Sequence, residues 1–334
     1  MSQIASQTQR ILVSALQSTA TDIHFSPYQE NVPVHFRVHG KRIYHSSLTV
    51  QTYQKMLSYL KFVSGMDIGE IKRPQNGTLP FRNGADTFSL RLSTLPVTGN
   101  ESLAIRVLPQ SQHLPLEQLF LFPSQHAKIK QWLLQRNGVI LLTGPTGSGK
   151  TTTLYALVQS VLSHHSYQAI TLEDPIEKDL NNIIQVQVNE RAGITYDAGL
   201  KAALRHDPDV IMVGEIRDYQ TARFAFQAAQ TGHLVISTIH AKNAFGTVLR
   251  LKDMGIAQST LEQTLISIAS QQLVTLTCGP HLPSRAAIVE IMEKEILSKA
   301  LRNIPPEEQP SFQSFAKLRR RAYAYGFIDD NETL

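Results

Sequence analysis

The pattern of hydrophobic and polar positions divides the chain in two. Apolar residues recur at helical spacing over residues 4–16 and again over residues 53–63, where Gly65 is placed to end the helix. Between these segments, apolar and polar residues alternate over residues 32–38, which predicts a half-buried strand. We therefore expect an N-terminal domain of mixed helix and sheet over residues 1–110.

Two later strands of this domain alternate in the same way, over residues 88–92 and 103–107. If they pair through the loop at residues 96–101, Arg91 and Arg106 stand on the same non-core face of the sheet. The pattern leaves two interpretations open. The arginines are either solvated residues on an open face, or a pair held rigidly enough to reach a phosphate on another domain or subunit.

The pattern changes after this domain. Residues 108–116 are rich in proline and glutamine without a periodicity, which predicts a linker at residues 111–120, although residues 116–134 read as helical. From residue 137 the pattern becomes strand, loop and helix, repeated. That repeat predicts an α/β domain over residues 121–334, with a parallel sheet wrapped by helices and a helical C-terminal part.

A phosphate-binding motif follows the first of these strands, because the apolar run at residues 139–142 leads into G-x-x-x-x-G-K-T and then a helix. The residues predicted to bind a nucleotide are Gly144, Pro145, Thr146, Gly147, Ser148, Gly149, Lys150, Thr151 and Thr152. The glycines let backbone N–H groups cradle phosphate oxygens at a helix N-terminus. Lys150 would reach the β- and γ-phosphates, and the Thr151 hydroxyl would ligate Mg²⁺. The motif predicts ATP and Mg²⁺ as ligands.

Three further strand ends carry polar residues, where an open α/β sheet binds its ligands. Glu173 and Asp174 read as the first exposed acids after one strand, an apolar run leads into Glu215, and His233 and His240 bracket a third strand. A glutamate there can orient or deprotonate the attacking water, and a histidine can sense the γ-phosphate. Lone histidines are more often structural, and the sequence leaves open whether Glu215 acts alone or shares the role with Glu173.

Length and composition limit the classes of protein to which this chain can belong. At 334 residues a single core is near its limit, and 42% hydrophobic with 18% charged residues is typical of a folded soluble protein. Cys278 is the one cysteine, which excludes a disulfide framework and fits a reducing cytosol. The sequence shows neither a signal peptide nor an apolar run of about 20 residues that could span a membrane. The net charge of +5 permits an acidic partner without requiring one.

In this order, the motifs resemble those of the secretion ATPases of the type II secretion and type IV pilus superfamily. The matching segments are residues 21–24, 73–77, 144–152, 173–177, 204–218 and 233–240. The resemblance implies a PAS-like N-terminal domain, a RecA-like ATPase domain and a homo-hexameric ring that opens and closes with turnover. It also implies that Arg91 and Arg106 close onto the phosphates and that Arg217 ties the site together. Gly214, where other P-loop NTPases carry aspartate, is normal for this family.

Short length with assembly-type motifs, such as residues 67–77, resembles the competence-pseudopilus ATPases of Gram-positive bacteria. This resemblance implies a cytoplasmic motor, held at the inner face of the membrane by a polytopic platform protein, that powers pseudopilus assembly for DNA uptake. Many assembly members carry a zinc site of four cysteines, but only Cys278 is present here, so no zinc is expected.

Other functions stay open at this point. They are a type II secretion motor, a pilus retraction motor, a scaffold that binds nucleotide without hydrolysis, and a RecA-like nucleic-acid translocase. A translocase needs a basic groove interleaved with aromatic residues. Aromatic residues make up only 7% of the chain and no basic stripe lies near the motifs, so direct nucleic-acid binding is not expected.

Overall fold

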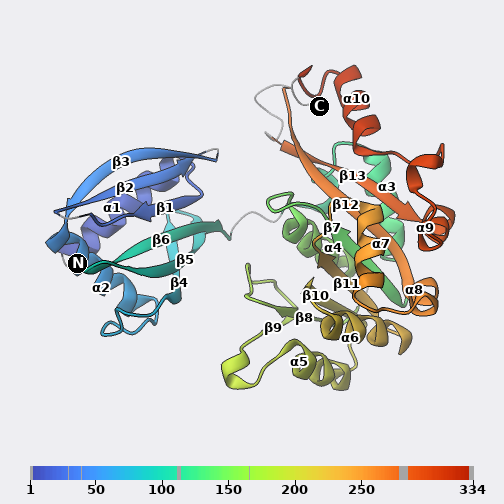
Figure 1. The fold of residues 1–334 in the computed structure, drawn as a ribbon, viewed down its shortest axis with the longest axis horizontal. Helices are drawn as coiled ribbons and strands as arrows, with labels where there is room; N and C mark the ends of the chain where they lie inside the picture. The colour runs from blue at the N-terminus through green and yellow to red at the C-terminus, as the bar shows by residue number, and fades with distance from the viewer. Residues whose placement is uncertain are drawn as a thin grey trace. The chain divides into compact units, whose positions relative to one another are not determined.

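The computed structural model describes residues 3–28, 30–38, 40–110, 114–164, 166–277 and 285–330. The chain divides into two compact units, Met1–His113 and Leu114–Leu334, which Figure 1 shows in blue to teal and in green to red. The division falls within the segment predicted as a linker. Each unit has its own core and is described by itself.

The first unit is an antiparallel sheet packed against two helices. The strands, in the spatial order β3-β2-β1-β6-β5-β4, are β1 (Asp22–Phe25), β2 (Asn31–Val38), β3 (Lys41–Thr49), β4 (Gln75–Asn83), β5 (Asp86–Val97) and β6 (Asn100–Pro109). The helices are α1 (Gln3–Gln17) and α2 (Val50–Val63), whose apolar faces share one core with the sheet. Both predicted helices and the predicted strand at residues 32–38 are confirmed.

The predicted pairing of the two arginine-bearing strands is also confirmed. Arg91 of β5 lies directly opposite Arg106 of β6, while their neighbours Leu90 and Leu92 point into the core. The predicted loop is shorter than expected, because β5 extends to Val97 and β6 begins at Asn100.

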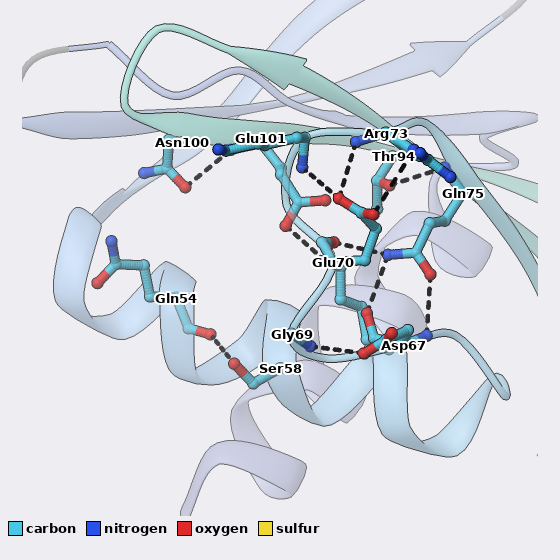
Figure 2. A network of polar contacts seen from close by, with 12 residues as sticks. Gln54, Ser58, Asp67, Gly69, Glu70, Arg73, Gln75, Thr94, Asn100 and Glu101 are labelled. Atoms are coloured by element: carbon cyan, nitrogen blue, oxygen red, sulfur yellow. Dashed lines mark hydrogen bonds and ion pairs between the residues drawn. The ribbon is translucent and has the colours of Figure 1, made fainter.

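The segment between α2 and β4 is held by a network of polar contacts (Figure 2). The Gln75 side chain donates to the carbonyls of Asp67, at 2.9 Å, and Glu70, at 2.8 Å, and accepts from the Asp67 amide at 2.9 Å. Lys61 Nζ also donates to the Glu70 carbonyl, at 2.8 Å, and pairs with Glu101 Oε2 at 2.5 Å. Lys61 and Glu101 are 1% and 3% exposed, so their charges compensate each other inside the unit.

The second unit is built on a largely parallel sheet in the order β13-β12-β7-β11-β10-β8-β9, in which only β13 runs antiparallel to its neighbour. Its strands are β7 (Gly138–Thr143), β8 (Ala169–Glu173), β9 (Ile184–Gln187), β10 (Val210–Ile216), β11 (Leu234–Ile239), β12 (Leu265–Thr275) and β13 (Arg285–Glu293). Its helices are α3 (Pro123–Trp132), α4 (Lys150–His164), α5 (Tyr196–Ala203), α6 (Tyr219–Gln230), α7 (Ala244–Asp253), α8 (Gln258–Thr264), α9 (Lys294–Leu301) and α10 (Phe315–Ala324).

Both faces of the sheet are buried at β7, β8 and β11 and at the start of β10, which is why these strands read as largely apolar runs. Val139 and Leu141 of β7 belong to the core that includes α6, whereas Ile140 and Leu142 belong to the core that includes α4. The predicted mixed α/β fold is therefore confirmed.

One predicted helix is wrong. Residues 116–134 were expected to be helical throughout, but a 3-10 turn at Leu116–Gln118 is followed by a break before α3. In the break Phe120 pairs with Ala287 of β13, and Pro123, which lacks an amide hydrogen, suits the first turn of a new helix. Residues 116–120 of the predicted linker are thus packed on the second unit.

Cys278 lies outside the described residues, which resume at Arg285, the first residue of β13. Within the described part of the chain, none of the helices is long and apolar enough to cross a membrane.

Candidate nucleotide-binding site

The phosphate-binding motif forms the loop between β7 and α4, at the carboxyl edge of the second sheet. Gly144 has a φ of 139°, and a Cβ there would lie 2.3 Å from the backbone oxygen of Gln271. Glycine is required on both counts. Ser148 is buried, and its hydroxyl has no hydrogen-bond partner among the described residues.

Lys150 is the first residue of α4 and is only 8% exposed. Its ammonium group donates to the carbonyls of Gly144, at 2.9 Å, and Pro145, at 2.8 Å. Burial lowers the pKa of Lys150, and the charge of Glu215 acts in the opposite direction. The loop at this helix N-terminus has a glycine where a side chain would not fit, a buried lysine and a hydroxyl without a partner. These features fit the phosphates of a nucleotide.

Gln271 of β12 is part of this site, although the sequence analysis missed it. Its buried side chain donates from Nε2 to the Ser148 carbonyl at 2.6 Å and accepts from the Thr153 hydroxyl at 2.9 Å. The available signal was weak: a Gln-Gln pair inside a strand that also carries two serines.

The direction of the Glu215 side chain is set by a bulge in β10. The register with β11 shifts between Val213 and Ile216, so two residues of β10 face one residue of β11. Side-chain hydrogen bonds from β11 satisfy the carbonyls at the bulge. The hydroxyls of Ser237 and Thr238 donate to the carbonyls of Val213 and Gly214, each at 2.7 Å. The Glu215 side chain is 19% exposed, at the end of a buried strand.

The structure also explains Gly214. A Cβ at this position would lie 3.3 Å from the Leu172 carbonyl oxygen and 3.4 Å from the Glu173 Cα, both on neighbouring β8. The aspartate found here in other P-loop NTPases would press against that backbone.

An ion-pair cluster surrounds Glu215. Arg217 pairs with Glu215 through Nε and with Asp174 through Nη1, the latter at 3.0 Å. From the other side, His240 Nε2 lies 3.1 Å from Glu215 Oε2. Thr143, the last residue of β7, accepts from the Ala241 amide at 3.0 Å and so ties the His240 loop to the strand that precedes the phosphate loop.

Glu173 differs from the expectation, because it is the last residue of β8 and only 3% exposed. Its carboxylate accepts hydrogen bonds from Tyr155 of α4, from Thr171 at 2.7 Å and from Gln185 of β9 at 3.1 Å. The prediction that it is an exposed acid is wrong. Asp174, the next residue, is exposed.

His233 is not brought to this site. β11 runs parallel to β7 with Leu234 beside Gly138, so His233 lies at the amino edge of the sheet, one strand length from the phosphate loop. There its Nδ1 lies 3.1 Å from the Ala228 carbonyl oxygen. Two residues that bracket a strand cannot share one edge of the sheet, and only His240 is at the carboxyl edge.

Arg91 and Arg106 belong to the other unit. Arg106 Nε is paired with Asp22 Oδ1 of β1 at 2.9 Å, and Arg37 approaches the same carboxylate at 3.8 Å. Burial acts to raise the pKa of Asp22, but the hydrogen bonds from Arg106 and Thr21, together with the positive charge of Arg106, outweigh it, so the pKa is lowered. The arginine side chains therefore stand on a positively charged row of the first sheet.

Comparison with known proteins agrees with this geometry. The family model of the type II/IV secretion system proteins matches residues 1–307. Competence protein ComGA of Bacillus subtilis is 39% identical over 99% of this chain and 97% of its own length, and ComGA of Halalkalibacterium halodurans is 41% identical over 99% and 98%. The crystal structure of the pilus retraction motor PilT with bound ADP superposes with a TM-score of 0.78 at 28% identity, covering 97% of this chain and 95% of PilT. The chain therefore belongs to the type II/IV secretion system protein family and is a P-loop ATPase of that family.

Proposed function

We propose that this chain hydrolyses ATP at the carboxyl edge of the second sheet, with Glu215 as the residue that orients and deprotonates the attacking water. The observation that carries this assignment is the bulge in β10. It turns Glu215 out of a buried strand at the carboxyl edge of the sheet, where only β11 separates β10 from β7, the strand that leads into the phosphate loop. A base needs this access to a water molecule, and the carboxylate of Glu173 is already occupied by three donors.

The remaining residues have distinct tasks in this proposal. Backbone N–H groups of residues 144–149 other than Pro145, and the Lys150 ammonium group, would hold the β- and γ-phosphates. The Thr151 hydroxyl would hold Mg²⁺, which neutralises phosphate charge when it is bound. Arg217 fixes the Glu215 carboxylate against Asp174, and His240 holds its other oxygen.

We further propose that hydrolysis drives a homo-hexameric ring, in which a PAS-like first unit closes on a RecA-like second unit. Arg91 and Arg106 would then reach the phosphates. Their place on one face of a rigid antiparallel pair supports this role, because neither side chain is committed to the core. Such closure would convert turnover into movement.

The biological role that we propose is assembly of a competence pseudopilus for DNA uptake, through a polytopic membrane platform protein at the inner face of the cell membrane and without direct contact with DNA. Both ComGA proteins support it, because each is matched over nearly its whole length. A pilus retraction or type II secretion motor is the second candidate. It is supported by the PilT structure and by Aeromonas hydrophila type II secretion system protein E, of which this chain covers 59%.

One set of measurements tests the ring and its chemistry together. Mass and ATP turnover would be measured with and without MgATP for wild type, Lys150→Ala and the double variant Arg91→Ala/Arg106→Ala. We expect a hexamer and turnover for wild type, and for the arginine variant nucleotide binding without turnover. Normal turnover by the arginine variant would contradict domain closure while leaving Glu215 as the base.

The biological role needs a cellular test. Deletion of the gene from a transformable host should abolish DNA uptake, and wild type but not Lys150→Ala should restore it. A host that takes up DNA normally without the gene would contradict the competence role and favour the second candidate.

A further inference from the structure

The Gln271 side chain is a buried amide whose nitrogen and oxygen are both hydrogen-bonded. It is 2% exposed on β12, and its Nε2 donates to the Ser148 carbonyl while its Oε1 accepts from the Thr153 hydroxyl. Only this orientation of the amide satisfies both hydrogen bonds, because the opposite one would place Gln271 Oε1 against the Ser148 carbonyl oxygen, and both atoms are acceptors. The side chain therefore links the phosphate loop to the second turn of α4.

The contact with Ser148 fixes a peptide plane. The bond between Ser148 and Gly149 is trans, since Asp174–Pro175 is the cis peptide that the described residues contain. In a trans peptide the carbonyl and the next N–H point in opposite directions. Because Gln271 holds the Ser148 carbonyl toward β12, the Gly149 N–H points away from β12.

That N–H belongs to the row that would cradle the phosphates. A flipped peptide would replace this donor with a carbonyl oxygen facing an anion. The backbone oxygen of Gln271 also closes the other end of the loop, where a Cβ on Gly144 would lie 2.3 Å from it. β12 thus contacts the phosphate loop at both ends.

We propose that Gln271 is a positioning residue that sets the phosphate cradle, by holding the Ser148–Gly149 peptide with its N–H toward the nucleotide. The proposal rests on the proposed function, because it concerns the same site. It predicts that loss of the amide weakens phosphate binding without unfolding the protein. The sequence motif does not contain this residue, which comes from a strand 123 positions away from Ser148.

The neighbouring residue provides a matched control. Gln272 is also a glutamine of β12, but its Oε1 accepts a hydrogen bond from Nη2 of Arg319 of α10 at 3.0 Å. Among the described residues, its side chain has no hydrogen bond to the phosphate loop. Methionine is close to glutamine in size and cannot make these hydrogen bonds. The same substitution at both positions therefore separates the contact with the loop from a general effect on β12.

The test measures MgADP affinity by calorimetry and thermal unfolding without nucleotide, in the full chain. Gln271→Met should raise the Kd of MgADP about tenfold, since a buried carbonyl loses its donor. Gln271→Glu should raise it further, because a carboxylate then faces the Ser148 oxygen. Gln272→Met should bind as wild type does. Thr153→Val, which removes the donor at Oε1, should weaken binding about threefold and carries the test if Gln271→Met does not fold.

One result would overturn the proposal: a Gln271→Met variant that binds MgADP with the same Kd as Gln272→Met, whether or not its unfolding temperature falls. Lys150→Ala, measured alongside, separates this failure from that of the proposed function. If wild type and Lys150→Ala alike do not bind MgADP, the nucleotide site itself is wrong.

Discussion

Glu215 and His240 contact each other across the carboxyl ends of two adjacent parallel strands, with His240 Nε2 at 3.1 Å from Glu215 Oε2. The contact exists because the bulge in β10 turns Glu215 outward and because Thr143 pins the loop that carries His240. A histidine in this position can hold the carboxylate in place and respond to the charge of a bound phosphate.

Replacing His240 should therefore slow catalysis. We expect His240→Ala to lower kcat about tenfold with a smaller change in nucleotide affinity, because one hydrogen bond to the base is lost. Steady-state ATPase assays check this result. His233→Ala is the control: it lies at the other edge of the sheet and should keep wild-type kcat. Equal losses in both variants would contradict the placement of His240 beside the base.

Replacing Glu173 and Glu215 by glutamine should have different effects, on stability for Glu173 and on turnover for Glu215. Glu173 accepts three hydrogen bonds, two of which join β8 to α4 and β9, so Glu173→Gln should lower the free energy of unfolding by about 1–3 kcal/mol. Denaturant unfolding measures this loss. In the folded fraction, turnover should fall less than for Glu215→Gln. A variant of unchanged stability that loses turnover as completely as Glu215→Gln would make Glu173 a base as well.

The buried pair of Lys61 and Glu101 should dominate the stability of the first unit. Glu101→Leu leaves the Lys61 charge buried without its partner and should cost about 3–5 kcal/mol. The double variant Lys61→Met/Glu101→Leu removes both charges and should recover most of this loss. Calorimetry of the full chain would follow the transition of the first unit. A double variant as unstable as the single one would show that the packing matters and not the charge.

Glu290 of β13 gives a prediction on pH. Burial raises its pKa above the ordinary 4.5, although the backbone N–H groups of Phe315 and Ala244 partly offset this effect. The folded protein therefore holds this proton more tightly than the unfolded chain. The resulting cost is absent below pH 4.5 and complete above the raised folded-state pKa.

Glu290→Gln removes this titration. The free energy of unfolding of wild type should fall relative to that of the variant as pH rises through this window. Denaturant unfolding of both proteins from pH 4 to pH 8 provides the comparison. A difference that stays constant with pH, or that changes in the opposite sense, would contradict the burial argument.

The site residues that could be predicted from the sequence are those whose role is set by residues close to them in the chain. Lys150 lies in a contiguous motif, and Glu215 ends an apolar run that could only be a buried strand. The facing arginines of the first unit followed from alternation alone, because a hairpin with a short turn fixes its own register.

The residues that sequence reasoning placed wrongly depend on distant partners. Glu173 reads as an exposed loop acid until Tyr155 and Gln185 are brought to it by α4 and β9. Gln271 has partners 118 and 123 positions away, so no local pattern could identify it. His233 was misplaced for a simpler reason, since the direction of its strand already assigned it to the other edge.

The most direct test of the account is ATP turnover by Glu215→Gln, with MgATP affinity measured on the same samples. If Glu215 is the base, kcat should fall on the order of 10²–10⁴-fold while the Kd of MgATP stays close to that of wild type. A variant that turns over ATP at the wild-type rate would contradict the assignment of Glu215 and, with it, the functional meaning of the bulge in β10.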